Sequence, residues 1–362
     1  MRPTALHIDK NALLHNYCTI SQQAPNSQII AMVKSNAYGC GLEYVTTALT
    51  NQIYAFGVAC VAEAMAIRSF GLHDKCVIFQ GVHQAHEWQL AAQHGFEVVL
   101  HHPEQLKWLI EKPLSRPVSI WIKVNTGMHR LGFPLASLSK VAKELRECNW
   151  VHSEIGLMTH FACADEVNHP LNVQQVDNWL SVAKDWQGPV SACNSAAIWS
   201  LPQCHGTHVR PGITLYGVSP FAQNTFIDLN LRPVMRYCSA IMTIWDYPIG
   251  ASIGYGATFT TTRPSKIGLV AVGYGDGYPR HVAHGSCVWV NGFLAPIVGK
   301  ISMDMLAVDL TDIKHVKLGD AVELWGENLA LEKVALQAGT IAYEIMCQVC
   351  PRERLLELYF NR

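Results

Sequence analysis

Residues 28–41 read QIIAMVKSNAYGCG, an apolar run that ends at one lysine, Lys34, followed by small and polar residues. A run that is apolar on both faces is typical of a strand in a buried parallel sheet. Active sites of α/β proteins lie at the carboxyl ends of such strands. We therefore expect Lys34 to be a buried active-site residue. Burial would favour the neutral form of its amine, which is the nucleophilic form. The alternative is a lysine that only extends its charge from a strand end into solvent.

Further strand-like runs occupy residues 54–59, 76–80, 97–100, 118–124, 154–159, 189–193 and 207–216. Helix-like segments lie between most of them, such as VAEAMAIRSFG from Val61 and LSKVAKELREC from Leu138. Eight alternations within about 200 residues are typical of a (β/α)8 barrel. No Gly-x-Gly-x-x-Gly motif follows the first strand, which disfavours a dinucleotide-binding sheet. The sequence predicts an α/β fold, with a (β/α)8 TIM barrel over residues 1–230.

The pattern changes after residue 230. Short β-branched and aromatic runs, separated by Gly, Pro and Asp turns, occupy residues 239–250, 266–277, 286–299 and 320–327. One helix is expected at 331–338, ending at Gly339. These features predict a second, mainly β domain over residues 231–362.

Composition limits the class of protein. The 362-residue chain is 15% charged and 49% apolar with a net charge of −1, so neither nucleic acid nor an anionic membrane is an expected partner. The first residues, MRPTALHIDKNALLHNY, lack a continuous apolar core, and we expect a cytoplasmic protein. The 12 cysteines are expected to be reduced. Cys347 and Cys350 lack a second pair of ligands, so we expect no metal site.

Several predicted barrel strands end in polar or basic residues, namely Lys34, Lys123, His160, Asn194 with Ser195, and Arg210. Taken singly, His160 is more often a hydrogen-bonded core residue, and Arg210 could pair with a surface acid. Taken together, polar residues after so many separate strands indicate an active site. Ser195 and the backbone amides of Gly212 and Ile213 follow strands 7 and 8, where barrel enzymes bind phosphate.

Motifs distributed along the chain resemble those of the alanine racemase family. They are AMVKSNAYGCG at 31–41, NTGMHRLGF at 125–133, MTHFACAD at 158–165, CNSAA at 193–197, RPGITLYG at 210–217, SIGYGATF at 252–259, GYGDGYPR at 273–280, GKISMD at 299–304 and AYEI at 342–345. They follow the family's order over nearly the whole chain, so the resemblance is far more specific than any single glycine-rich motif.

The resemblance implies pyridoxal 5'-phosphate as cofactor, with Lys34 as its Schiff-base lysine. The other residues implied to bind the cofactor are Tyr38, His160, Ser195, Arg210, Gly212, Ile213 and Tyr343. Arg210 would face the pyridine nitrogen. Arginine is too weak an acid to protonate that nitrogen, so the ring would be a less effective electron sink and side reactions would be limited.

The resemblance also implies two opposed proton-transfer groups, Lys34 and Tyr255. Taken alone, a tyrosine in a glycine-rich turn is usually a packed aromatic residue. Arg130 and the backbone amide of Met303 would bind the substrate carboxylate. To act as a base, Tyr255 needs cationic neighbours that stabilise its phenolate, and His160 and Arg130 are the candidates. The family forms head-to-tail homodimers in which this tyrosine approaches the lysine of the other subunit.

At positions outside the proton-transfer pair, this chain matches the family pattern in some places and differs from it in others. Lys123 matches a lysine that is often carbamylated in the family, and carbamylation would let it lie beside Arg130 without repulsion. Tyr274 and Tyr343 match residues that narrow the substrate corridor in the family, and Asp304 would have a structural or orienting role. This chain has Asn125 where the family commonly has aspartate. It also has Cys40 for a frequent histidine and Lys300 for a common arginine.

We therefore expect an alanine racemase that supplies D-alanine for peptidoglycan. One alternative is an amino-acid racemase of broader specificity. A fold-related decarboxylase of basic amino acids would release CO2 and need a different substrate anchor. A cofactor-carrying barrel without turnover would not need the second domain.

Overall fold

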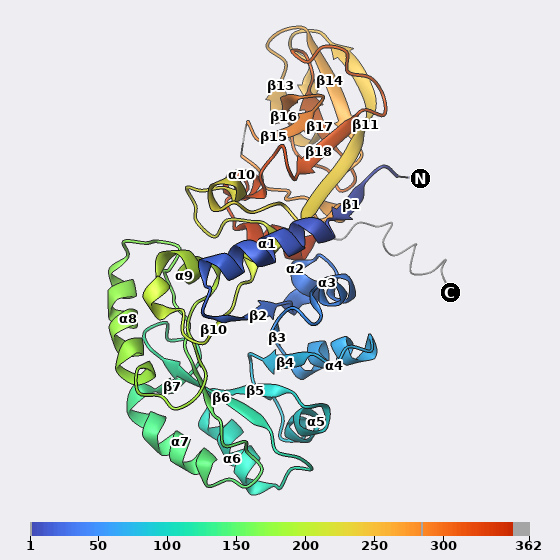
Figure 1. Cartoon of the computed structure of the whole chain (residues 1–362). Coiled ribbons are helices and arrows are strands. Elements are labelled where there is room, and N and C mark those ends of the chain that lie inside the picture. The colour runs from blue at the N-terminus through green and yellow to red at the C-terminus, as the bar shows by residue number, and fades with distance from the viewer. Residues whose placement is uncertain (1, 284, 350–362) are drawn as a thin grey trace. The chain divides into compact units, whose positions relative to one another are not determined.

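The computed structural model describes residues 2–283 and 285–349, which divide into two compact units (Figure 1). One unit comprises residues 14–37 and 41–215. The other comprises the described parts of residues 1–13, 38–40 and 216–362. Cys350 of the Cys-x-x-Cys pair lies outside the described residues. Within the described chain, every helix is too short or too polar to span a lipid bilayer.

The first unit is built on eight parallel strands in the order β10-β2-β3-β4-β5-β6-β8-β9. The ring nearly closes between β9 and β10, where the Arg210 N–H donates to the Cys193 carbonyl (2.9 Å). The strands are β2 Gln28–Met32, β3 Ala55–Val58, β4 Lys75–Ile78, β5 Glu97–Leu100, β6 Ser119–Asn125, β8 Gly156–Met158, β9 Val190–Ser191 and β10 His208–Val209. A short β7, Phe133–Pro134, pairs with β6. The predicted (β/α)8 barrel is confirmed.

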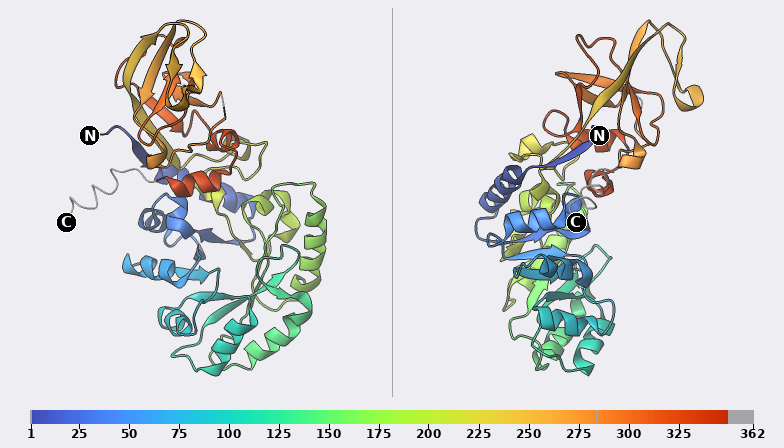
Figure 2. Two further views of the ribbon diagram at one scale, coloured as in Figure 1. Left: turned by 180° about the vertical axis from the view of Figure 1, so that it is seen from behind. Right: turned by 90° about the vertical axis from the view of Figure 1, so that its right-hand side faces the viewer.

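Helices lie around the outside of these strands (Figure 2). The helices up to residue 200 are α1 Lys10–Gln23, α3 Leu42–Leu49, α4 Val61–Ser69, α5 Glu87–His94, α6 Pro103–Glu111, α7 Leu138–Arg146, α8 Pro170–Ala183 and α9 Ser195–Ser200. The label α2 covers Lys34–Tyr38, a left-handed turn that follows β2. Inside the ring, six successive strands each contribute one side chain to an apolar cluster: Ile30, Ala55, Val77, Val99, Trp121 and Met158. Burial of this layer is the hydrophobic driving force for closing the barrel.

The last barrel strand is much shorter than predicted. The sequence predicted a strand over residues 207–216, but β10 covers only His208–Val209, and residues Ile213–Tyr216 form a 3-10 helix. Pro211 explains the difference, because proline has no N–H to continue the ladder of hydrogen bonds. The early end of β10 leaves Gly212 in a short loop and Ile213 at the start of the 3-10 helix, at the carboxyl end of the barrel.

The second unit is an antiparallel sheet in the order β1-β11-β14-β17-β16-β15-β18, in which β18 also pairs with β11 and closes the sheet. Its strands are β1 Ala5–Ile8, β11 Met235–Tyr247, β14 Ser265–Val270, β15 Cys287–Val290, β16 Phe293–Val298, β17 Leu306–Asp309 and β18 Ala321–Trp325. The short strands β12 Ser252–Ile253 and β13 Phe259–Thr260 form a separate pair, and the helices are α10 Leu331–Gln337 and α11 Ala342–Gln348. The predicted mainly β carboxyl-terminal domain is confirmed.

Strand β1 belongs to this unit and not to the barrel, which the sequence did not predict. The sequence grouped the first residues with the barrel, but β1 pairs antiparallel with β11, from Ala5 opposite Cys238 to Ile8 opposite Met235. A four-residue strand whose partner lies more than 200 positions away leaves little local signal, because its pairing is decided by tertiary contacts.

Gly217 lies where the backbone of this unit has no room for a side chain. It has a φ of +74°, and a Cβ added there would lie 1.7 Å from the carbonyl oxygen of Arg232. We expect Gly217→Ala to lower the free energy of unfolding by about 3 kcal/mol or more, because both the left-handed backbone and the overlap oppose a side chain. Gly250→Ala is the control, since Gly250 has a φ of +84° but no atom within 4 Å; it should cost about 1 kcal/mol. Equal losses in urea unfolding would contradict the packing argument.

Candidate active site

Residues from different strands meet at the carboxyl end of the barrel. Lys34 follows β2, Lys123 lies near the end of β6, and His160 follows β8. Arg210 directly follows β10, and Ser195 begins α9 after β9. The structure therefore brings the predicted strand-end residues to one end of the barrel, where enzymes of this fold place their chemistry.

Arg210 is the most firmly held of these residues. It is 4% exposed; its Nη1 donates to Ser191 Oγ (2.6 Å), and its Nη2 donates to the carbonyl oxygens of Thr159 (2.7 Å) and Ala192 (3.0 Å). The same Nη2 lies 3.3 Å from Nδ1 of His160, which accepts. Sequence reasoning did not select Thr159 or Ser191, although both lie near the ends of strands that lead to predicted site residues.

The guanidinium of Arg210 has no anionic partner among the described residues. All the contacts above use its two Nη nitrogens, so none of them engages Nε. Burial lowers the pKa of Arg210 to about 10, which still leaves it charged at neutral pH. A buried cation without a carboxylate is costly, so this arrangement fits a ligand that carries an acceptor or an anion.

Lys123 and His160 lie in the same positive environment. Burial, followed by the charges of Arg210, Arg130 and Lys34, lowers the pKa of Lys123 to about 7. Burial and the same cations hold the pKa of His160 well below its usual value, so its imidazole is neutral. Positive charge concentrated in a shielded site attracts anionic groups such as phosphates and carboxylates.

Ser195 marks a place where backbone amides converge. Its Oγ accepts from the N–H of Gly212 (2.9 Å) and of Thr214 (3.4 Å), and it lies 3.1 Å from Thr214 Oγ1. Asn194 caps α9 by accepting from the N–H of Ala197 (3.0 Å). Because donors from the loop after β10 already point at one oxygen, this loop fits the phosphate group that the sequence predicted here.

The backbone after Lys34 has an unusual conformation. Residues 35–38 all have φ between 53° and 55°, a left-handed turn with no glycine in it. Lys34 itself is exposed in the single chain, so the burial expected from the sequence is wrong for this chain alone. The burial of Lys34 was expected from the apolar run that precedes it. Residues 29–33 of that run are buried, but the burial ends before Lys34.

Arg130 lies in the loop that follows β6 and, with Lys123 and His160, lines a small cavity. The departure at Asn125 has a local structural role. Its Oδ1 accepts from the N–H groups of Gly127 and His129 (both 3.1 Å), so the side chain shapes the turn that leads to Arg130.

Three predicted site residues of the second unit are largely exposed. Tyr255 is 70% exposed, Met303 53% and Tyr274 40%. The loops that carry Tyr274 and Met303 are joined, because the N–H of Tyr274 donates to the carbonyl of Ser302 (3.1 Å) and the N–H of Gly275 to that of Met303 (2.9 Å). Their exposure leaves these side chains accessible to a ligand or a partner.

The remaining predicted cofactor residues form an aromatic group in the second unit. The ring of Tyr38 stacks on Tyr216 with centroids 4.8 Å apart and lies 6.1 Å from Tyr343. Burial, and then Tyr343 and Cys347, raise the pKa of Tyr38, so its phenol is protonated and can donate a hydrogen bond. A neutral donor of this kind suits a phosphate oxygen.

Arg2 holds the Tyr274 and Met303 loops together, and sequence reasoning did not find it. Its Nη2 donates to Oδ2 of Asp276 (2.7 Å), whose side chain is 1% exposed, and to the carbonyl oxygen of Asp304 (2.5 Å). The same Asp276 oxygen accepts from the N–H of Gly273 (3.0 Å). Predicted supporting residue Asp304 thus enters this network through its backbone.

We expect Arg2→Ala to raise KM for the substrate about fivefold while changing kcat less, because looser loops would hold the Met303 amide, the predicted ligand of the substrate carboxylate, less firmly. Steady-state kinetics measure this. Arg263→Ala is the control, since Arg263 makes a similar two-contact pair with Asp312 on the surface of the same unit. An unchanged KM in Arg2→Ala, or an equal rise in the control, would contradict the prediction.

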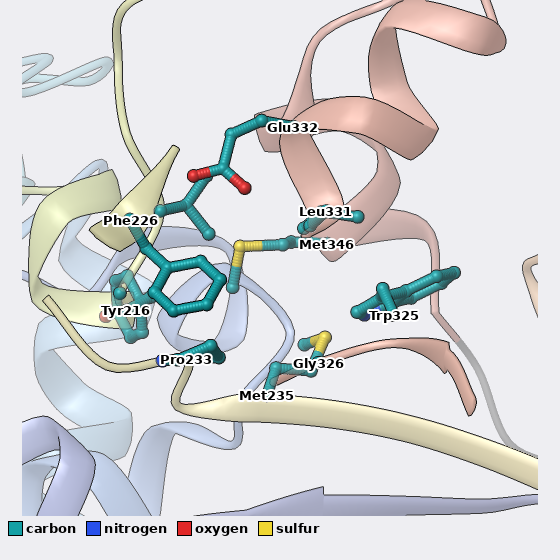
Figure 3. A pocket seen from close by; sticks show the side chains of 11 residues that line it. Tyr216, Phe226, Pro233, Met235, Trp325, Gly326, Leu331, Glu332 and Met346 are labelled. Atoms are coloured by element: carbon teal, nitrogen blue, oxygen red, sulfur yellow. The ribbon is translucent and has the colours of Figure 1, made fainter. Parts of the chain in front are cut away.

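A separate apolar pocket in the second unit is too small to be this site. It has a volume of about 10 Å³ and is lined by residues that include Tyr216, Phe226, Trp325 and Met346 (Figure 3). Glu332 lies at its wall and accepts from the N–H of Ser219 (2.8 Å), and burial raises the pKa of this carboxyl. The pocket has room for about one water molecule and contains none of the basic residues.

The barrel and the basic residues at the carboxyl ends of its strands are features of an enzyme with a site that attracts an anionic group. Comparisons with known proteins agree. The family model "Alanine racemase, N-terminal domain" matches residues 8–220, and "Alanine racemase, C-terminal domain" matches residues 234–356. An alanine racemase of Legionella pneumophila (strain Lens) is 52% identical over 98% of this chain and 99% of its own length.

Solved structures give the same result. The biosynthetic alanine racemase of Pseudomonas aeruginosa superposes with a TM-score of 0.94 at 40% identity, covering 97% of this chain and 98% of that one. Alanine racemase of Bartonella henselae, solved with covalently bound pyridoxal phosphate, has a TM-score of 0.87 at 31% identity, with 97% and 98% covered. The chain belongs to the alanine racemase family and is an amino-acid racemase.

Proposed function

We propose that this protein interconverts L-alanine and D-alanine with pyridoxal 5'-phosphate bound covalently to Lys34. Two opposed groups, the Lys34 amine and the Tyr255 phenol, move the α-proton. The observation that carries the proposal is the pair of buried basic residues Arg210 and Lys123 at the carboxyl end of the barrel. The contacts of Arg210 use its Nη atoms and leave Nε for an acceptor outside the chain. The barrel unit would supply Lys34 and most of the cofactor-binding residues, and the β-rich unit would supply Tyr38, Tyr343 and the catalytic Tyr255.

The residues present fit the cofactor. Ser195, Gly212 and Ile213 would hold the phosphate together with Tyr38 and Tyr343, and the convergence of amides on Ser195 supports this role. Arg210 would face the ring nitrogen, held by Thr159, Ser191 and Ala192. Neutral His160 would keep Arg210 in place by accepting from its Nη2.

Bound pyridoxal phosphate supplies an electron sink for the pair of electrons that the α C–H bond releases. Arg130 and the Met303 amide would bind the substrate carboxylate. The Lys34 Nζ would take or give the α-proton on one face of Cα, and the Tyr255 oxygen would do so on the other. Two groups on opposite faces invert the centre without rotating the substrate.

The proposed assembly is a head-to-tail homodimer in which Tyr255 of one subunit approaches Lys34 of the other. The exposure of Tyr255 and Met303 in the single chain is compatible with it, because a partner subunit could reach both side chains. We further propose, from the family resemblance, that the reaction takes place in the cytoplasm and supplies D-alanine for peptidoglycan.

Lys123 is proposed to be carbamylated. Only a neutral amine reacts with CO2, and a pKa of about 7 makes the neutral form abundant at physiological pH. The carbamate is an anion and would neutralise part of the charge of Arg130 and Arg210.

A substrate panel tests this function. Protein reconstituted with pyridoxal phosphate is incubated with each enantiomer of alanine, serine and lysine, and products are separated on a chiral column. We expect alanine to be racemised with a kcat/KM at least about 100-fold above the others. Similar values for all three would favour the broader racemase, and CO2 release from lysine would favour a decarboxylase.

A further inference from the structure

The left-handed turn after Lys34 needs an external support. Residues 35–38 adopt positive φ values that L-amino acids rarely take, and each carries a side chain that opposes the conformation. Such a segment persists only where surrounding contacts determine it. The turn begins at the peptide bond that joins Lys34 to Ser35, so whatever fixes that peptide also fixes the backbone of the lysine.

Glu63 makes the contact at that peptide. It lies in the first turn of α4, and its Oε1 accepts from the N–H of Ser35 (2.8 Å). Its Oε2 accepts from the N–H of Ala59 (2.7 Å), in the loop between β3 and α4. One carboxylate thus ties the loop after β2 to the loop after β3, through two charge-assisted hydrogen bonds.

Two other bonds of the turn are local to it. The N–H of Ala37 donates to the carbonyl of Val33 (2.8 Å), and Asn36 Oδ1 accepts from the N–H of Leu42 (2.8 Å). These bonds close the turn locally. The bond from Ser35 to Glu63 links its first amide to a different strand–helix unit of the barrel.

We propose that Glu63 is a positioning residue for Lys34, which fixes the first peptide of the left-handed turn and thereby the direction in which the lysine side chain leaves the backbone. This rests on the proposed function, in which Lys34 transfers the proton. Both carboxylate oxygens of Glu63 accept from backbone N–H groups, so Glu63 would act on the lysine through the backbone. A misplacement of the reacting amine by about 1 Å is enough to lower the rate about 100-fold.

Glu87 provides a matched control in the same barrel. It lies in the first turn of α5, and its Oε2 accepts from the N–H groups of His83 and Gln84 in the loop before that helix. Glu87 therefore holds the loop before its own helix, as Glu63 does at Ala59, and its two bonds do not involve the Lys34 turn. Removing either glutamate leaves backbone N–H groups before a helix without this acceptor, and only Glu63 should affect the lysine.

The experiment compares Glu63→Ala, Glu63→Gln and Glu87→Ala in holoprotein. Hydrogen exchange of peptides covering residues 35–42 is the readout that does not depend on turnover, and we expect faster exchange in Glu63→Ala alone. We also expect kcat to fall about 100-fold in Glu63→Ala with KM changed less than about threefold. Glu63→Gln, which keeps one acceptor oxygen, should recover about tenfold of that loss, and Glu87→Ala should keep wild-type kcat.

The proposal is overturned if exchange at 35–42 is unchanged in Glu63→Ala, or if kcat falls equally in Glu87→Ala. If Glu63→Ala does not fold, Glu63→Gln with exchange and kcat like the wild type would overturn it as well. Failure of the proposed function would look different, because wild-type protein would then lack racemase activity while the exchange comparison still reported on the turn.

Discussion

Replacing Lys34 by alanine is expected to lower kcat for alanine racemisation by at least about 10⁴-fold. The substitution removes both the proposed covalent anchor for the cofactor and one of the two proton-transfer groups. Lys34→Arg should be as inactive, because a guanidinium keeps the charge but stays protonated. D-alanine formation from L-alanine, followed by chiral chromatography, measures the effect.

The control for this substitution is Lys140→Ala, which removes an exposed lysine of α7 whose side chain is 82% exposed. It should leave kcat unchanged. If Lys34→Ala kept more than about one per cent of the wild-type kcat, Lys34 would not have the proposed role.

Tyr255→Phe is expected to lower racemisation about 10³-fold in both directions. The two directions must fall together, because the enantiomers are equal in free energy and the equilibrium constant is 1. The two-base scheme shows itself in a different measurement. In deuterium oxide, one enantiomer should still exchange its α-hydrogen through Lys34, whereas exchange of the other should fall with racemisation.

Proton nuclear magnetic resonance of each enantiomer separately records this exchange. Tyr247→Phe is the control, since Tyr247 belongs to the same unit and packs against its apolar cluster. Loss of exchange by equal factors for L-alanine and D-alanine in Tyr255→Phe would argue against two opposed bases.

Apolar runs that alternate with helix-like segments predicted the barrel, because barrel strands are buried on both faces. Residues 29–33 are all buried, and the strand at Glu97–Leu100 was predicted to the residue. The same reasoning failed after Val209, where the apolar pattern continues to Tyr216 but Pro211 ends the ladder. An apolar run reports burial, and it does not report whether the backbone is extended.

Residues that act through long-range contacts could not be found from the sequence. Arg2 is bonded to Asp276 and to the backbone of Asp304, and nothing local to Arg2 indicates those partners. In the sequence, Glu63 looks like an ordinary acidic residue in the first turn of a helix. Only the fold brings the Ser35 N–H to one oxygen of its carboxylate while the other accepts from Ala59. The basic strand-end residues were found, because parallel strands gather their carboxyl ends in every barrel.

The measurement that tests the central claim most directly is borohydride reduction of protein reconstituted with pyridoxal phosphate, followed by peptide mapping. Reduction converts a Schiff base to a stable secondary amine, so the modified residue can be identified by mass. The account predicts loss of the visible absorbance and one pyridoxyl adduct, on Lys34. An adduct on another lysine, or protein that stays colourless after reconstitution, would contradict it.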